Sequence, residues 1–117
     1  MTGETIDLDH LEKYVAGDNE LRNEILQIFA EQVDNLLKEF DVFQTDDDWQ
    51  NTAHTLKGAA RGVGAWKLGQ VCEEAEKLSG LSPAKQEARA TALVSIRHFG
   101  RTAIEDARTL CLLKEAV

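Results

Sequence analysis

A histidine, a lysine and a glycine stand close together in the segment AHTLKGAARGVGAWKL, residues 53–68. Lys57 follows His54 by three residues and Gly58 follows it by four, so a helix places all of them on one side. An imidazole ring offers a neutral, nucleophilic nitrogen near pH 7. Lys57 would set an ammonium group beside negative charge that gathers on that ring. The spacing therefore indicates a histidine that receives an anionic group.

Further polar residues continue the same exposed strip of the helix, namely Gln50, Asn51 and Arg61. Arg61 would extend the positive local field, and all of these side chains are candidates for partner contact. Glycine inside a helix costs about 0.5–1 kcal/mol relative to alanine, so Gly58 indicates a close approach to the imidazole by a large partner. The competing interpretation is an ordinary solvated helix face, because short patterns of this kind are common.

Glu76 is the residue expected to orient the histidine. The chain turns at Gly64–Ala65, His54 lies ten residues before Gly64, and Glu76 lies eleven after Ala65, so an antiparallel hairpin brings His54 and Glu76 level. A carboxylate that accepts from one ring nitrogen fixes the tautomer and leaves the other nitrogen as the nucleophile. The alternative is that Glu76 is an ordinary surface acid in the run EEAEK, and the sequence leaves both open.

Amphipathic segments must position these residues. Asp7 is a candidate N-cap for a short helix that Gly17 ends, and Asp18 can cap a second helix that runs to about Phe43. Further helices are predicted over 47–63, over 65–79 and from Pro83 onward, with Gly62 and Gly64 closing the third by a left-handed turn. Four long helices with short turns predict an all-α, antiparallel up-down four-helix bundle with an additional short N-terminal helix, as a single domain over 1–117.

Two apolar features allow more than one interpretation. The apolar positions of the second helix cover about half of its circumference, which exceeds the stripe of roughly 100° that faces a bundle core. The excess either packs under the first helix or is left for a partner. Trp66 lies off the apolar stripe of its helix, so it either contacts a partner or covers the end of the bundle.

Composition and charge exclude several classes of function. The net charge of −8 argues against nucleic acid and against an anionic membrane surface. The three histidines, at positions 10, 54 and 98, have no Glu three residues before them, so a di-iron bundle is not indicated and no metal site is expected. Cys72 and Cys111 fall at apolar positions and are expected to be buried thiols. The opening MTGETIDLDH lacks the features of a signal peptide, and we expect a cytoplasmic monomer.

AHTLKGAARGVGAWKL resembles the signature of histidine-containing phosphotransfer (HPt) domains of two-component phosphorelays, roughly A-H-[ST]-L-K-G-[AS]-[AS]-x-x-[LIV]-G-A-x-x-L. Every fixed position is matched, and IDLDHLEKYVAGD and LRNEILQIFAEQ are similar to the family's usual opening. The resemblance implies that His54 is phosphorylated on its outer ring nitrogen. Lys57 would assist the phosphoryl group, and Gly58 would leave room for a receiver domain.

The resemblance also implies partners and a direction for the chemistry. His54 would exchange a phosphoryl group with an aspartate on the receiver domain of a hybrid histidine kinase or of a response regulator. Gln50, Asn51 and Arg61 would contact that receiver, which would carry the Mg²⁺, while this chain needs no cofactor. GAARGVG lacks the Gly-Lys-Ser/Thr ending of a nucleotide-binding loop, so no self-phosphorylation from ATP is expected.

Glu76 departs from the family pattern, because free-standing members commonly have Gln at the ring-orienting position, whereas acidic residues there resemble chemotaxis-type kinases. A glutamate would orient the ring better than a glutamine but would repel a phosphoryl group. The alternative function is a helical adaptor that binds signalling partners without phosphotransfer.

Overall fold

The computed structural model describes residues 5–80 and 82–115. Over this part of the chain there are five helices and no strand: α1 (Leu8–Val15), α2 (Asn19–Glu39), α3 (Asp46–Gly62), α4 (Trp66–Glu76) and α5 (Pro83–Glu115). The predicted all-α bundle with a short N-terminal helix is confirmed. The assignment of 1–117 to one domain and the monomeric state stay predictions.

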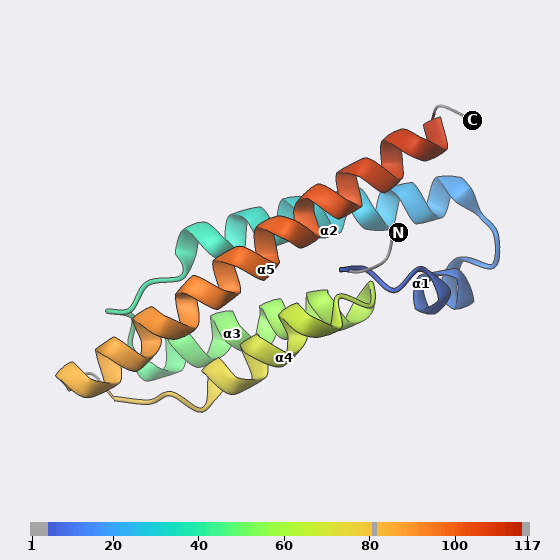
Figure 1. Ribbon diagram of the computed structural model, residues 1–117. Coiled ribbons are helices and arrows are strands. Elements are labelled where there is room, and N and C mark those ends of the chain that lie inside the picture. Colours follow the sequence, from blue (N-terminus) through green and yellow to red (C-terminus); the bar gives the residue numbers. More distant parts are fainter. Residues whose placement is uncertain (1–4, 81, 116–117) are drawn as a thin grey trace.

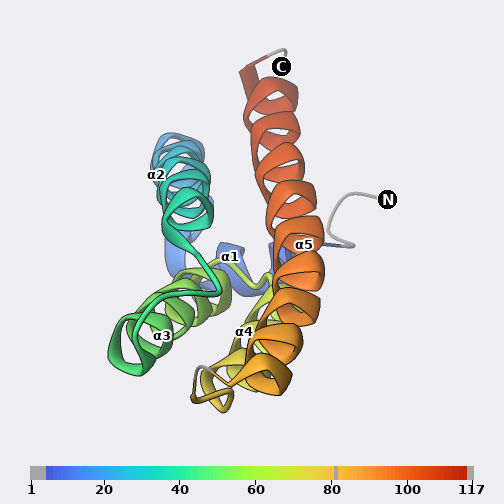
Figure 2. The same cartoon turned by 90° about the vertical axis from the view of Figure 1, so that its left-hand side faces the viewer.

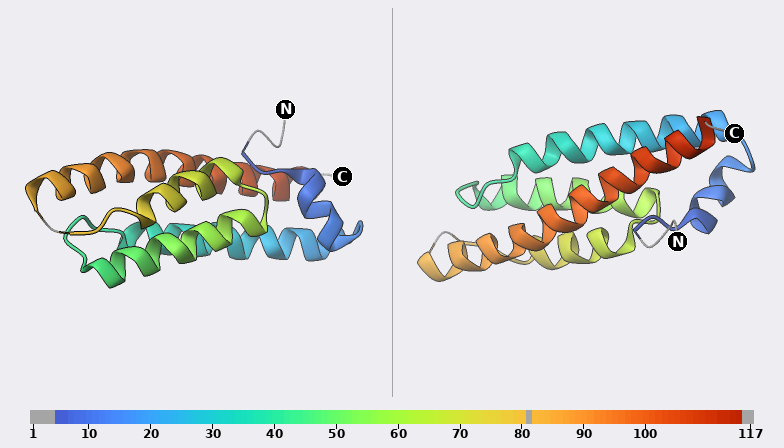
Figure 3. Two further views of the ribbon diagram at one scale, coloured as in Figure 1. Left: turned by 90° about the horizontal axis from the view of Figure 1, so that it is seen from below. Right: turned by 45° about the horizontal axis from the view of Figure 1, so that its top comes forward.

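The two longest helices, α2 and α5, run side by side in opposite directions, and the α3–α4 hairpin packs against them (Figure 1). Figure 2, turned by 90° from Figure 1, shows α2 and α3 on one side of the molecule and α4 and α5 on the other. The molecule is elongated, with extents of 52 × 21 × 20 Å. Helix α1 lies at one end, near the start of α2 and the turn between α3 and α4 (Figure 3). The backbone of Asp7 fixes this position, because its N–H donates to the carbonyl of Gly64 at 3.0 Å.

Side-chain caps define the starts of the first three helices. Asp7 accepts from the backbone N–H of His10, and Asp18 accepts from that of Leu21, as the sequence predicts. Helix α3 begins at Asp46, one residue before the predicted start. Its cap is Thr45, whose hydroxyl accepts from the N–H of Asp48 at 3.2 Å.

Two helices end earlier than the sequence predicts. Helix α2 ends at Glu39 and not at Phe43, because Phe40 takes an extended conformation and the Asp41 carboxylate then accepts from the N–H of Phe43 at 2.9 Å. Such a local turn competes with the helix for the backbone donors. Helix α4 ends at Glu76 and not at Ser79. Here the last N–H groups donate to carbonyls three residues back, and the N–H of Gly80 donates to Asp46 at 2.6 Å.

Gly64 is the glycine that the turn between α3 and α4 requires. Its φ is +79°, and a Cβ atom there would lie 2.7 Å from the Cβ of Asp7. The prediction that Gly62 also takes a left-handed conformation is wrong, because Gly62 is the last helical residue of α3 and Gly64 alone reverses the chain. This turn sets the register between α3 and α4.

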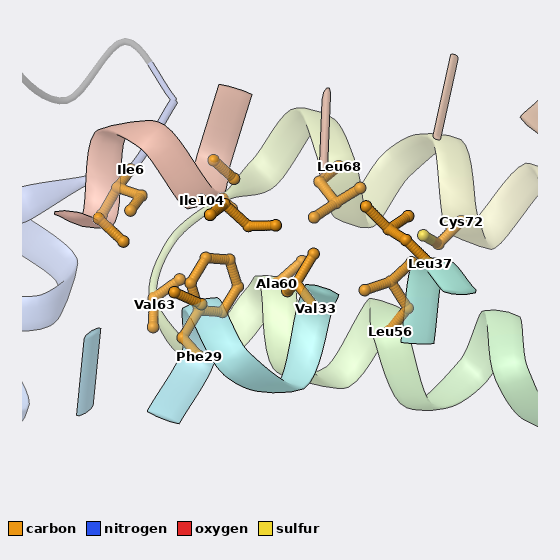
Figure 4. Packing of buried hydrophobic residues seen from close by; sticks show 14 of the residues in the cluster. Ile6, Phe29, Val33, Leu37, Leu56, Ala60, Val63, Leu68, Cys72 and Ile104 are labelled. Carbon is orange, nitrogen blue, oxygen red and sulfur yellow. The ribbon is translucent and has the colours of Figure 1, made fainter. Parts of the chain in front are cut away.

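The core lies between the four long helices, and Figure 4 shows its packing close to the α3–α4 turn. The predicted stripe of α3 is buried throughout: Trp49, Ala53, Leu56, Ala60 and Val63. Both cysteines are buried, as predicted. Burial disfavours the thiolate and raises the pKa of Cys72 to about 12.

The wide apolar arc of α2 is only partly covered. Ile25 and Leu36 pack against the core, but Ile28 is 63% exposed and Leu21 is 39% exposed. The structure therefore leaves part of the predicted apolar arc exposed. None of the described helices combines the length and apolar character needed to span a membrane.

Candidate functional site

Helix α3 holds its polar face outward because its apolar face is locked in place. Trp49 is fully buried, and its indole N–H donates to the carbonyl of Ala75 at 2.7 Å, which ties α3 directly to α4. His54 lies on the opposite side of α3, and its side chain is 72% exposed. The imidazole is thus carried by a rigid element and stays open to a partner.

Glu76 lies next to the histidine, as the hairpin argument predicts. Its Oε1 atom is 3.4 Å from Nδ1 of His54. Because Nδ1 is the ring nitrogen that faces the carboxylate, Nε2 is the nitrogen left for a reaction. The contact joins α3 to α4, and the register set at Gly64 makes it possible.

Lys57 also contacts Glu76, which the sequence argument missed. Its Nζ lies 2.6 Å from Oε1 of Glu76, and the side chains are 15% and 25% exposed. The Lys57 hydrogen bond is the main reason that the pKa of Glu76 is lowered, and His54 adds a smaller effect. The sequence places Lys57 on an exposed strip, but the structure has it mostly buried and paired. Glu76 is therefore ionised near neutral pH, and the Lys57 ammonium offsets its negative charge.

Arg61 is paired as well. Its Nη2 lies 2.5 Å from Oε2 of Glu73 on α4, and both side chains are about half-exposed. Gly69 contributes to this pair, because a Cβ at that position would lie 3.2 Å from Cγ of Arg61. The positive field expected from Arg61 is thus largely compensated by Glu73.

A shallow polar groove runs beside the histidine, between α3 and α4. Its lining residues are Gln50, Asn51, His54, Lys57, Glu73, Glu76 and Lys77. Gln50 and Asn51 are therefore brought to the histidine as predicted, whereas Arg61 is not among the lining residues. Glu73 and Lys77 were not predicted, although they stand in the EEAEK run that suggested Glu76. Their position four residues apart, around Glu76, was the available signal.

Two glycines of α3 face open space. A Cβ atom at Gly58 or Gly62 would meet nothing within 4 Å, and neither residue has a positive φ. Internal packing and backbone conformation therefore explain neither glycine. Glycine weakens a helix, and no contact in the described part of the chain offsets that cost at these positions.

Trp66 covers the end of the bundle. Its indole N–H donates to Oδ2 of Asp7 at 3.0 Å, and its ring stacks edge-on against His10 at 4.8 Å between centroids. The same hydrogen bond is the main cause of the lowered pKa of Asp7. These contacts explain the position of Trp66 without a partner, although 47% of Trp66 remains exposed.

Comparison with known families gives one finding. The family model of the Hpt domain matches residues 24–110, a span that contains α3, α4 and the whole groove. The search of curated proteins and the search of solved structures gave no match. The match covers most of the chain, and it agrees with the bundle and with the resemblance of residues 53–68. The chain belongs to the Hpt family, the phosphocarrier domains of histidine phosphotransfer in phosphorelays.

Proposed function

We propose that His54 is the phosphorylated residue, and that it receives the phosphoryl group from an aspartyl phosphate on a receiver domain. The donor would be the receiver of a hybrid histidine kinase, and the acceptor would be an aspartate of a response regulator. The contact between Glu76 and Nδ1 of His54 carries this proposal. It selects Nε2 as the nucleophile on an imidazole that is 72% exposed.

The chemical step is an in-line displacement at phosphorus. The lone pair of Nε2 forms the N–P bond while the bond from phosphorus to the aspartate oxygen breaks, and its electrons remain on the aspartate carboxylate. The proton on Nδ1 stays on the ring, which becomes an imidazolium, and Glu76 faces that new positive charge. Return of the phosphoryl group to a second aspartate reverses the step. Positioning and charge compensation supply most of the catalysis in such transfers.

Lys57 reduces the repulsion that a glutamate next to the histidine would exert on the phosphoryl group. Its ammonium lies 2.6 Å from Glu76, so the carboxylate keeps its orienting contact while its charge is offset. A glutamate can therefore replace the glutamine common in the family. In this role Lys57 acts on the phosphoryl group through Glu76.

The receiver would dock over α3. Asn51, Gly58 and Gly62 are seven and four residues apart and share one helix face, next to His54. The missing side chains at the two glycines let a receiver bring its aspartate up to the imidazole. Gln50 would contact the receiver from the groove, and Arg61 from the next turn. The Mg²⁺ would be held by the receiver.

The decisive experiment is incubation with a receiver domain phosphorylated on its aspartate. We expect acid-labile, base-stable label on this chain and none on the His54→Gln variant. His98→Gln is the matched control, because His98 is an exposed histidine on α5 outside the groove. Equal labelling of the His54→Gln variant would refute the site. Receiver binding without any label on the wild type would favour a helical adaptor.

A further inference from the structure

The cations at the groove beside His54 differ in whether a carboxylate pairs with them. On α3, Lys57 is paired with Glu76 at 2.6 Å and Arg61 with Glu73 at 2.5 Å. Lys77 also lines the groove, and its side chain is exposed. In the described part of the chain, no carboxylate lies within ion-pair distance of Lys77. It is therefore the groove's uncommitted cation.

A phosphoryl group on His54 would bring new charge to this groove. The lining residues contribute two positive and two negative charges, from Lys57, Lys77, Glu73 and Glu76, so they sum to zero with a neutral imidazole. A phosphoryl group adds roughly −1.5 to −2 near pH 7. A cation that moves toward it without uncovering a carboxylate would compensate it best.

Lys57 does not meet that requirement. It is 15% exposed, and if it left Glu76 for the phosphoryl group it would uncover a carboxylate beside a dianion. Lys77 does meet it, because it directly follows Glu76 at the C-cap of α4 and has no partner to leave. A lysine has a flexible four-carbon stem and three donors, which suit an exposed phosphoryl group.

We propose that Lys77 contacts the phosphoryl group on His54, while Lys57 neutralises Glu76. This inference rests on the proposed function of His54. Two lysines then share the charge compensation that the sequence predicted for Lys57 alone. Lys77 stabilises the phosphorylated state, and Lys57 keeps the orienting carboxylate compatible with it.

The test compares Lys77→Gln with Lys67→Gln, which removes the same charge from an exposed residue at the other end of α4. Each protein is phosphorylated chemically with phosphoramidate, which requires no receiver, and the phosphohistidine is titrated by ³¹P NMR. We expect Lys77→Gln to raise the pKa of the phosphoryl group, because loss of a neighbouring cation disfavours the dianion. Lys67→Gln should leave that pKa at the wild-type value, and Lys77→Arg should restore it.

A second readout uses the phosphorylated receiver. Transfer to the Lys77→Gln variant should slow by about three- to tenfold, in the range expected for one partly exposed charge-assisted contact. Identical phosphoryl pKa values and transfer rates for Lys77→Gln and Lys67→Gln would overturn the role of Lys77. Failure of the receiver to label the wild type would instead count against the proposed function. The ³¹P arm would still report on Lys77, since it does not use the receiver.

Discussion

Several ion pairs join helices in the described part of the chain, and two of them lie in contrasting surroundings. One is Lys57–Glu76 beside His54, where the imidazole is 72% exposed. The other is Arg89–Asp46, where the guanidinium of α5 is completely buried and its Nη2 lies 2.7 Å from Oδ1 of Asp46. The first cluster borders a groove, whereas the second closes the end of the bundle where the α2–α3 and α4–α5 connections meet.

The buried cluster uses nearly all the hydrogen-bonding capacity of its arginine. Arg89 donates to the carbonyls of Val42, Gln44 and Leu78 as well as to Asp46, and its guanidinium lies over the Trp49 ring at 4.7 Å. A planar fork with five donors suits this arrangement, and a lysine would not replace it. The cluster thus ties two connections to α3 and α5.

Similar charges have different roles in the two clusters. Around Arg89 every observed contact is internal, so the cluster fixes structure. Around His54 the contact found in the described part of the chain joins Nδ1 to Glu76, which orients the ring, and the side chain is 72% exposed. We therefore expect substitutions at the two clusters to separate activity from stability.

The largest expected effect is the loss of phosphoryl acceptance in His54→Gln. An exposed substitution of this kind changes stability by no more than about 0.5 kcal/mol, so the variant should unfold as the wild type does. Labelling by a phosphorylated receiver and urea unfolding would be measured on the same preparation. A variant that lost both acceptance and stability would show that the two clusters are not separable.

Arg89→Met should have the opposite pattern. Asp46 is about half-exposed, so the main cost is that three carbonyls lose their donor, at roughly 1–3 kcal/mol for each buried group left unsatisfied. Urea unfolding should show the lower free energy of unfolding. The protein that remains folded should accept the phosphoryl group at the wild-type rate per folded molecule. Unchanged stability would contradict the structural role of Arg89.

The sequence carried a signal for Arg89 that the apolar pattern hides. Arg89, Leu93 and Ile96 follow the helical spacing, so the arginine occupies the buried stripe of α5. Periodicity predicted the helices because it reports which face is buried. It did not predict the early ends of α2 and α4, which depend on Asp41 and Asp46 accepting from backbone N–H groups in turns.

The candidate site was predictable only in part. Counting residues from Gly64 brought His54 level with Glu76, because hairpin geometry needs no side-chain detail. The pairing of Lys57 with that same carboxylate depends on side-chain conformations across two helices, so spacing along one helix pointed Lys57 toward solvent. Lys77 was not predicted for a similar reason, because it stands out only when the pairing of Lys57 and Arg61 across the two helices is known.

Gly58→Leu should slow phosphoryl transfer from a large donor but not from a small one. This effect is smaller than those expected at His54 and Arg89. A side chain there enters open space and favours helix, so stability should hold or rise by up to about 1 kcal/mol. Transfer from a receiver should slow by about tenfold, because the added side chain obstructs close docking. Phosphorylation by phosphoramidate should proceed at the wild-type rate. Equal slowing with both donors would mean that Gly58 affects the imidazole itself.

The smallest expected effect concerns acid stability and Glu76. Its folded pKa is lowered below the usual 4.5, chiefly by the Lys57 hydrogen bond, so folding favours the ionised form. This contribution is fully present above pH 4.5 and is lost as the pH falls through the lowered value. Glu76→Gln should therefore cost at most about 1 kcal/mol at pH 7, as partly exposed ion pairs do, and flatten the decline in stability below pH 4.5.

Glu74→Gln is the control for this acid effect. Glu74 is an exposed neighbour on α4 with no ion pair in the described part of the chain. Because Glu74→Gln keeps the Lys57–Glu76 contact, its unfolding free energy should retain the part of the acid decline that Glu76→Gln removes. If the two variants give the same curve, Lys57 does not stabilise the charge of Glu76. The Lys57–Glu76 contact would then no longer explain how a carboxylate beside His54 keeps its charge, and the contrast with the buried Arg89 guanidinium would fail.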